Sequence, residues 1–198
     1  MTSTPPIEAR GRRNARRTLT LLALICAAPV VASYIAYYWL RPAAHVNYGE
    51  LLGPVSAPDI RGTTLDGASF RLSSFRGRWV LLMVDGDACD AACERKLYAT
   101  RQARTMQGSE QERVMRVWLQ PASAPRPPPE LIARQPGMTW ARGDPRQWAS
   151  LSPEHESVVA RIYLIDPLGN LVLRYPANPD IKRVAKDLER LLRASRIG

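Results

Sequence analysis

The sequence predicts an α/β domain, with a mixed sheet flanked by helices, preceded by one N-terminal transmembrane helix. Thr18–Leu40 is a run of 23 residues without a charge. Arg78–Asp85 is almost continuously apolar, as expected for a central strand that is covered on both faces. Near the C-terminus, apolar residues recur at helical spacing and form one stripe, namely Ile181, Val184, Leu188, Leu191 and Leu192.

The N-terminal segment has the length and charge pattern of a membrane anchor. A helix over residues 18–40 is long enough to cross a bilayer. Arginines outnumber the single acid, Glu8, in residues 1–17. The positive-inside rule therefore predicts a cytoplasmic basic tail, with the C-terminal part across the membrane. A cleaved signal peptide is the alternative, but its apolar region would run only about 7–15 residues.

The net charge and the positions of the cysteines limit the functions that this chain can have. The net charge is +10, but the basic residues beyond the tail are spread along the chain. No aromatic-studded basic run or zinc-finger spacing accompanies them, which argues against a nucleic-acid partner. A solvated surface near anionic lipid or an acidic partner is the favoured interpretation. Of the three cysteines, Cys26 lies inside the predicted anchor and is interpreted as a packed small residue.

After the anchor, residues 41–57 are predicted to form a loose tether and residues 58–198 the folded domain. Alternation of apolar and polar residues predicts a half-buried strand. In order, the first half should contain a short strand and turn over 57–67, the half-buried strand over 68–72, a turn over 73–77, the central strand over 78–85 and a helix over 89–107.

The second half of the domain is predicted to end in an antiparallel hairpin and a helix. Prolines make residues 121–129 an exposed, stiff loop, and Asp180 is a suitable N-cap for the last helix. The other expected elements are a strand over 114–119, short helices around 130–135 and 145–151, a strand over 138–141 between them, a strand over 158–166, a turn over 167–170 and a strand over 171–175.

Cys89 and Cys93 are the most informative pair in the chain. They lie where the central strand turns into a helix, about one helical turn apart and on one face. This spacing lets them close a disulfide or hold one soft metal ion between two thiolates. With the predicted topology they face an oxidising compartment, where a disulfide is the default state. A structural staple is the alternative, although so short a loop gives little stabilisation.

Several segments resemble periplasmic thioredoxin-like proteins, namely Pro58–Asp59, Asp66–Gly67, Phe70–Leu72, Phe75–Leu81 and Ile162–Gly169. Thioredoxins and TlpA-type reductases have two residues between their cysteines, and the Sco/SenC cytochrome c oxidase assembly proteins have three. This chain has three, Asp90-Ala91-Ala92. Together with the anchor, the chain over roughly residues 55–195 is most similar to the Sco/SenC family. The resemblance implies a thioredoxin-like domain in the periplasm, held by a single pass in a bacterial inner membrane.

The resemblance implies that Cys89 and Cys93 either pass Cu(I) to a cytochrome c oxidase subunit or keep the thiols of that subunit reduced. Copper-binding relatives carry a histidine eight residues before the aspartate that corresponds to Asp166. Here Val158 stands in that position. His155 is therefore the candidate third copper ligand, ahead of Met83, Met106, Met138 and the membrane-proximal His45.

Two further functions stay open beside the assembly factor. A general thiol–disulfide oxidoreductase is the first, although Ala160 stands where thioredoxins carry a cis-proline. A non-catalytic domain with a structural disulfide is the second. A helix N-terminus favours the thiolate of Cys89, and Arg95 and Lys96 act in the same direction. The acids Asp87, Asp90 and Glu94 raise a thiol pKa, so the net shift stays open.

Overall fold

The computed structural model describes residues 8–39, 47–86, 88–152 and 157–195. The chain divides into two units, Met1–Val46 and Asn47–Gly198. The first unit contains helix α1 (Glu8–Trp39). Within it, Arg16–Tyr38 has a mean hydropathy of 2.2 and is long and apolar enough to cross a membrane. The predicted N-terminal apolar helix is therefore present.

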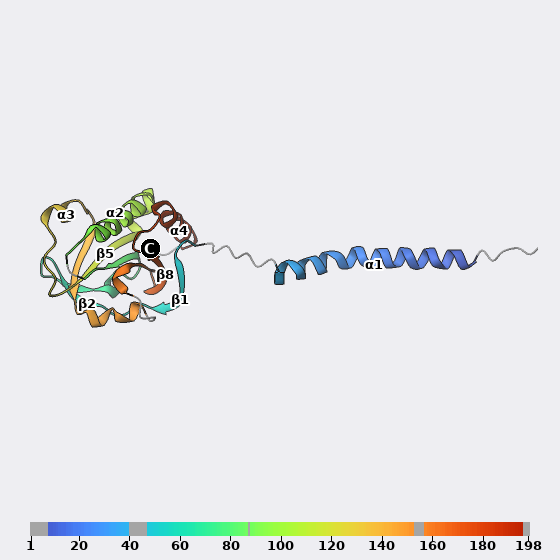
Figure 1. The fold of residues 1–198 in the computed structure, drawn as a ribbon, viewed down its shortest axis with the longest axis horizontal. Coiled ribbons are helices and arrows are strands. Elements are labelled where there is room, and N and C mark those ends of the chain that lie inside the picture. The colour runs from blue at the N-terminus through green and yellow to red at the C-terminus, as the bar shows by residue number, and fades with distance from the viewer. Residues whose placement is uncertain (1–7, 40–46, 87, 153–156, 196–198) are drawn as a thin grey trace, which may run out of the picture. The chain divides into compact units, whose positions relative to one another are not determined.

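The second unit is built on one mixed sheet of eight strands in the order β1-β8-β7-β4-β5-β6-β2-β3 (Figure 1). β4, β5 and β6 run parallel, and the other neighbouring strands are antiparallel. The strands are β1 (Glu50–Ser56), β2 (Arg61–Thr64), β3 (Ser69–Arg71), β4 (Trp79–Val84), β5 (Val114–Pro121), β6 (Met138–Gly143), β7 (Arg161–Ile165) and β8 (Asn170–Pro176). The predicted mixed sheet is confirmed, and every residue of its central strand β4 is buried.

Helices cover one face of this sheet. α2 (Ala91–Thr105) and α4 (Ile181–Ala194) lie side by side (Figure 1), and Gln107 Nε2 next to α2 donates to Ala185 O of α4 at 3.1 Å. α3 (Pro129–Ala133) adds Leu131 to the same apolar layer. The opposite face is covered by short 3-10 turns and loops that contribute Leu72, Trp148 and Leu151. This layering places the end of β4 beneath the start of α2.

The structure differs from the sequence-based prediction at four places. Residues 50–56, expected within the tether, form the edge strand β1, which pairs with β8 and has a register shift between Leu51 and Val55. Gly53 and Pro54 suggested a loop, but an edge strand tolerates proline at a bulge. The expected helix near 145–151 consists of two short 3-10 turns, and residues 158–160 form another 3-10 turn before β7. In the proline-rich loop, Ala124 and Pro127 are buried rather than exposed.

Candidate dithiol site

The strand-to-helix turn after β4 brings together Cys89 and Cys93, the two cysteines predicted to form the site. Asp90 is the N-cap of α2, and its side chain accepts a hydrogen bond from the Cys93 amide at 2.8 Å. Cys93 therefore lies in the first turn of the helix and Cys89 just before it. The two residues form a disulfide with their Cα atoms 5.2 Å apart, within the range that disulfides require.

The two sulfurs differ in accessibility. Cys93 is 2% exposed and packs in the apolar layer beneath α2. Cys89 is only partly buried at the edge of the same layer. An external thiolate or metal ion therefore reaches Cys89 first. The Cys93 sulfur lies on the buried side of the Cys89 sulfur, where it can attack that sulfur or be displaced from it.

A buried ion pair that the sequence analysis did not identify lies next to the dithiol. Asp85, directly after β4, accepts hydrogen bonds from Lys96 Nζ at 2.5 Å and from Trp118 Nε1 at 2.6 Å. Lys96 is 1% exposed and lies three residues beyond Cys93 on the buried face of α2. Its ammonium also donates to Val84 O at 3.3 Å and Val159 O at 2.7 Å, so it has three acceptors for its three protons.

The sequence held a signal for this pair. Asp85 closes a strand that is otherwise apolar, and Lys96 falls in the helical stripe of Cys93, Leu97 and Thr100. Its neighbour Arg95 is exposed, so adjacent basic residues of α2 lie in different environments. The structure places Lys96 in the core, so its charge is committed to Asp85.

The carboxylates around the dithiol have shifted pKa values. Burial raises the pKa of Asp85, although the Lys96 ammonium and the Trp118 indole oppose this shift. The hydrogen bond from the Cys93 amide lowers the pKa of the exposed Asp90. Asp90 is therefore an anion at neutral pH and places a negative charge beside the sulfurs.

The structure describes the three methionines named as weaker copper-ligand candidates. Met83 is fully buried, and its sulfur accepts a hydrogen bond from Thr100 Oγ1 at 3.3 Å. Met106 follows the last residue of α2, at the end of the helix opposite the cysteines. Met138 begins β6 and lies level with Leu81 of β4, below the strand ends.

The position expected to carry a third ligand is apolar. Val158 is partly buried and packs against the core on the opposite face of the sheet from Cys93. The hydrogen bond from Lys96 Nζ to Val159 O holds the 3-10 turn that contains Val158 beside α2. His155 and His45 lie outside the described residues. Ala160 ends the 3-10 turn before β7.

The side chains at this site provide some, but not all, of the ligands that a soft metal ion needs. Within residues 8–39, 47–86, 88–152 and 157–195, no group of three or more His, Cys, Asp or Glu side chains could hold a metal. Two adjacent cysteine sulfurs are nevertheless the donors that Cu(I) prefers. The described residues therefore supply two thiolates, and no third His, Cys, Asp or Glu side chain among them completes a metal-binding group.

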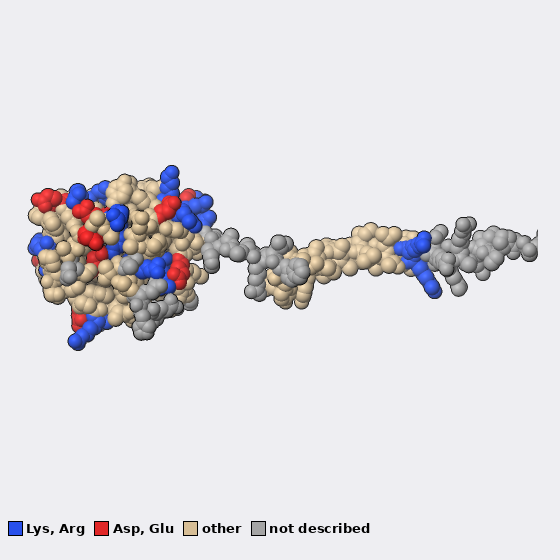
Figure 2. Space-filling model, viewed as in Figure 1, with Lys and Arg blue, Asp and Glu red and all other residues tan. Residues whose placement is uncertain are grey.

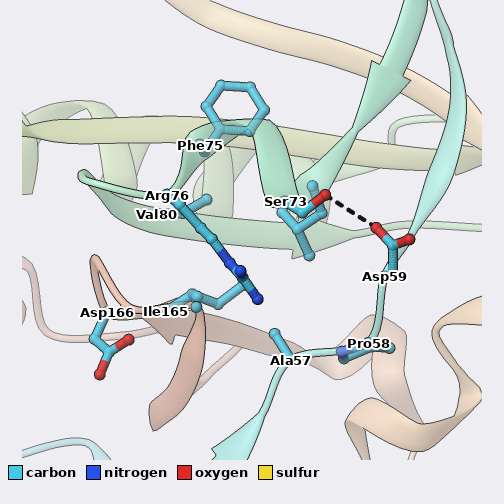
Figure 3. Close-up of a pocket in the computed structure, with 11 residues that line it drawn as sticks. Ala57, Pro58, Asp59, Ser73, Phe75, Arg76, Val80, Ile165 and Asp166 are labelled. Atoms are coloured by element: carbon cyan, nitrogen blue, oxygen red, sulfur yellow. Dashed lines mark hydrogen bonds between the residues drawn. The ribbon is translucent and has the colours of Figure 1, made fainter.

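A cavity of about 330 Å³ lies away from the dithiol and has different chemistry (Figure 3). Val80 and Ile165 on its wall pair with each other near the start of β4 and belong to the core on the face opposite Cys93. Arg76 and Asp59 give it charged walls, and Ser73 donates to Asp59 at 3.1 Å. No cysteine lines this cavity, so it is separate from the candidate site.

A mixed sheet with a dithiol at the first turn of the helix after its central strand defines a thioredoxin-like protein. The family of transmembrane-like, thioredoxin-like C-terminal domains matches residues 79–195. The chain belongs to this family. Comparison with curated protein sequences gives no significant match.

Solved structures show the same fold. Apo Sco1 from Thermus thermophilus is 25% identical, with a TM-score of 0.56, over 77% of this chain and 98% of that one. Yeast Sco1 with copper bound is 15% identical, with a TM-score of 0.58, over 72% and 94%. A thiol:disulfide interchange protein from Bacteroides sp. is 15% identical, with a TM-score of 0.54, over 74% and 93%. The predicted Sco/SenC-like, thioredoxin-like fold is thereby confirmed.

Proposed function

We propose that this chain is a membrane-anchored assembly factor for cytochrome c oxidase that uses Cys89 and Cys93 to handle Cu(I) or to reduce the thiols of an oxidase subunit. The observation that carries the proposal is the Cys89–Cys93 pair at the start of α2, with one sulfur accessible and the other buried. The similarity to Sco structures, some of them with copper bound, supports this choice among thioredoxin-like functions.

Copper is the cargo in this proposal. A dithiol reductant first donates two electrons and two protons to the disulfide and leaves two thiols. The thiols then lose two protons as their thiolates bind one Cu(I), because the thiolate is the form that ligates metal. The accessible Cys89 is the position from which a partner's thiolates can displace the ion.

A Cu(I) titration of the reduced full chain in detergent tests this function, with a chromogenic chelator as competitor. We expect one Cu(I) per chain and no stoichiometric binding in Cys89→Ser. His155→Ala should weaken binding by about tenfold if the histidine is a ligand, and His45→Ala is the matched control with no expected effect. Stoichiometric binding that survives Cys89→Ser would contradict the proposal.

Thiol–disulfide exchange on protein partners is the second candidate, and the observed disulfide favours it. The reduced Cys89 thiolate attacks a partner disulfide, forms a mixed disulfide and releases one partner thiolate. The Cys93 thiolate then attacks the Cys89 sulfur, re-forms the Cys89–Cys93 disulfide and releases the second partner thiolate. The partner gains two electrons, which this chain loses.

Trapping distinguishes the two candidates. Because Cys93 resolves the mixed disulfide, Cys93→Ser should accumulate a covalent complex with a disulfide-bonded oxidase subunit on a non-reducing gel. Cys89→Ser should accumulate none, since the remaining thiol is buried. Equal trapping by both variants, or by neither, argues against exchange through an exposed Cys89.

The proposed orientation places residues 1–17 in the cytoplasm, residues 18–40 in the inner membrane and the thioredoxin-like domain in the periplasm. Arginine enrichment before the apolar helix supports this orientation, as does a disulfide in the domain, because disulfides persist in oxidising compartments. After mild reduction of intact cells, a membrane-impermeant maleimide should label Cys89. Labelling only after the inner membrane is opened would reverse the orientation.

A further inference from the structure

Helix α4 presents a basic face to solvent. Its other side packs into the core through Val184, Ala185, Leu188 and Leu192. The outward side carries the basic residues Lys182, Arg183, Lys186, Arg190 and Arg193 and one acid, Glu189. We call these five residues the basic face of α4. Figure 2 shows Lys and Arg side chains gathered over this helix.

The chain enters the folded domain on this same helix. The amides of Tyr48 and Gly49 donate to Asp187 Oδ2 at 2.8 and 2.9 Å, and Asp187 is a buried residue of α4. The guanidinium of Arg183 lies 4.3 Å from the centre of the Tyr48 ring. A Cβ on Gly49 would lie 2.6 Å from Tyr175 Cε1, so glycine is required for this close approach. The entry point is thus fixed beside the basic face.

The length of chain before Tyr48 limits how far this face lies from the anchor. The segment that could cross a membrane ends at Tyr38. The residues between Tyr38 and Tyr48 span at most about 35 Å when fully extended. With α1 in a bilayer, a connection of this length would let α4 reach the lipid headgroups without a separate recruitment step.

We propose that the basic face of α4 binds the headgroups of anionic phospholipids in the membrane that holds α1. Charge complementarity and the short tether favour lipid over a soluble acidic protein, because the lipid surface is always within reach and a soluble partner must be recruited. Surface potential falls off within a Debye length, so binding requires α4 to touch the headgroup region. The inference rests on the anchoring part of the proposed function.

The lysines of the chain make this contact measurable. The only lysines are Lys96, Lys182 and Lys186, and Lys96 is 1% exposed. Acylation by an uncharged succinimidyl ester therefore reports on α4. The full chain is placed in nanodiscs of phosphatidylcholine, with or without about one-third phosphatidylglycerol, and the acetylation of each lysine is followed by mass spectrometry.

We expect Lys182 and Lys186 to react at least about threefold more slowly in the anionic discs and to recover at about 1 M NaCl, where the Debye length is about 3 Å. Arg190→Gln/Arg193→Gln should abolish most of the slowing. The control variant Arg71→Gln/Arg146→Gln removes the same charge from exposed positions outside α4. It should still show the slower acylation in anionic discs. Equal rates in both kinds of disc would overturn the inference, as would slowing that salt does not reverse.

The same preparation separates this inference from the proposed anchor. If the full chain does not co-purify with discs of either composition, the membrane-anchoring part of the proposed function fails, and the lipid contact fails with it. If the chain enters both kinds of disc and acylation is unchanged, the anchor stands and only the contact by α4 is refuted.

Discussion

Lys96 Nζ donates to Asp85 Oδ1 at 2.5 Å and to Val159 O at 2.7 Å. One buried side chain therefore joins the end of β4, the second turn of α2 and the turn before β7. Cys93 lies in the first turn of the same helix α2, and Val158 lies in the same turn before β7. The site is thus held by a charged cross-link within the core, where loss of either partner leaves an unpaired charge.

The Asp85–Lys96 pair should behave as one unit in stability measurements. Asp85→Asn leaves a buried ammonium and Lys96→Met a buried carboxylate, so each should lower the free energy of unfolding by about 3–5 kcal/mol. The double variant Asp85→Asn/Lys96→Met should recover most of the loss, because no charge is then left unpaired. Thermal unfolding of the full chain in detergent measures all four proteins. Additive losses would show that the two side chains are not coupled.

The Asp90 cap should set thiol reactivity separately from helix stability. In the reduced protein, Asp90→Asn removes a negative charge beside the sulfurs and keeps a capping oxygen. Alkylation of Cys89 at neutral pH should then accelerate by about threefold, which corresponds to about half a pKa unit. Asp90→Ala should also destabilise the protein, by about 0.5–2 kcal/mol, because the Cys93 amide loses its acceptor. A slower alkylation in Asp90→Asn would show that the carboxylate assists the thiolate.

The ion pair between Glu50 and Arg174 should contribute to acid stability. Arg174 donates to both Glu50 oxygens, at 2.7 and 2.8 Å, and these hydrogen bonds lower the pKa of Glu50 below its usual 4.5. The contribution is therefore present above pH 4.5 and is lost as the pH falls through the lowered value. Because the Glu50 side chain is 55% exposed, Glu50→Gln should cost under about 1 kcal/mol at neutral pH. Below pH 4.5, the free energy of unfolding of Glu50→Gln should depend less on pH than that of the unaltered protein. The same pH dependence in both proteins would refute a role of the Glu50–Arg174 pair in acid stability.

Much of the fold follows from local sequence patterns. The all-apolar stretch of β4 indicates a strand covered on both faces, and the apolar stripe on α4 indicates which side of that helix faces the core. Gly53 and Pro54 favour a loop when read locally, and they therefore predict a tether where the structure has β1. Its pairing with β8 depends on contacts more than a hundred residues away, which no local pattern records.

The sequence predicts the cysteine pair of the site, but it does not predict how exposed each sulfur is or which charged groups lie buried beside the pair. The spacing of Cys89 and Cys93 indicated a turn at a helix start. The difference in exposure between them depends on how α2 packs, and the pairing of Lys96 with Asp85 depends on where β4 ends. Both are tertiary properties. The sequence could name the charged residues near the sulfurs but could not show which of them are buried.

The cap on α2 holds the helix start without help from the sulfurs. The Cys93 amide is bound by the Asp90 carboxylate, so opening the S–S bond leaves the first helical turn with its acceptor in place. Oxidised and reduced forms should therefore share one backbone shape. A client docking on this surface would meet the same contour in either state, and the chain could cycle repeatedly without refolding.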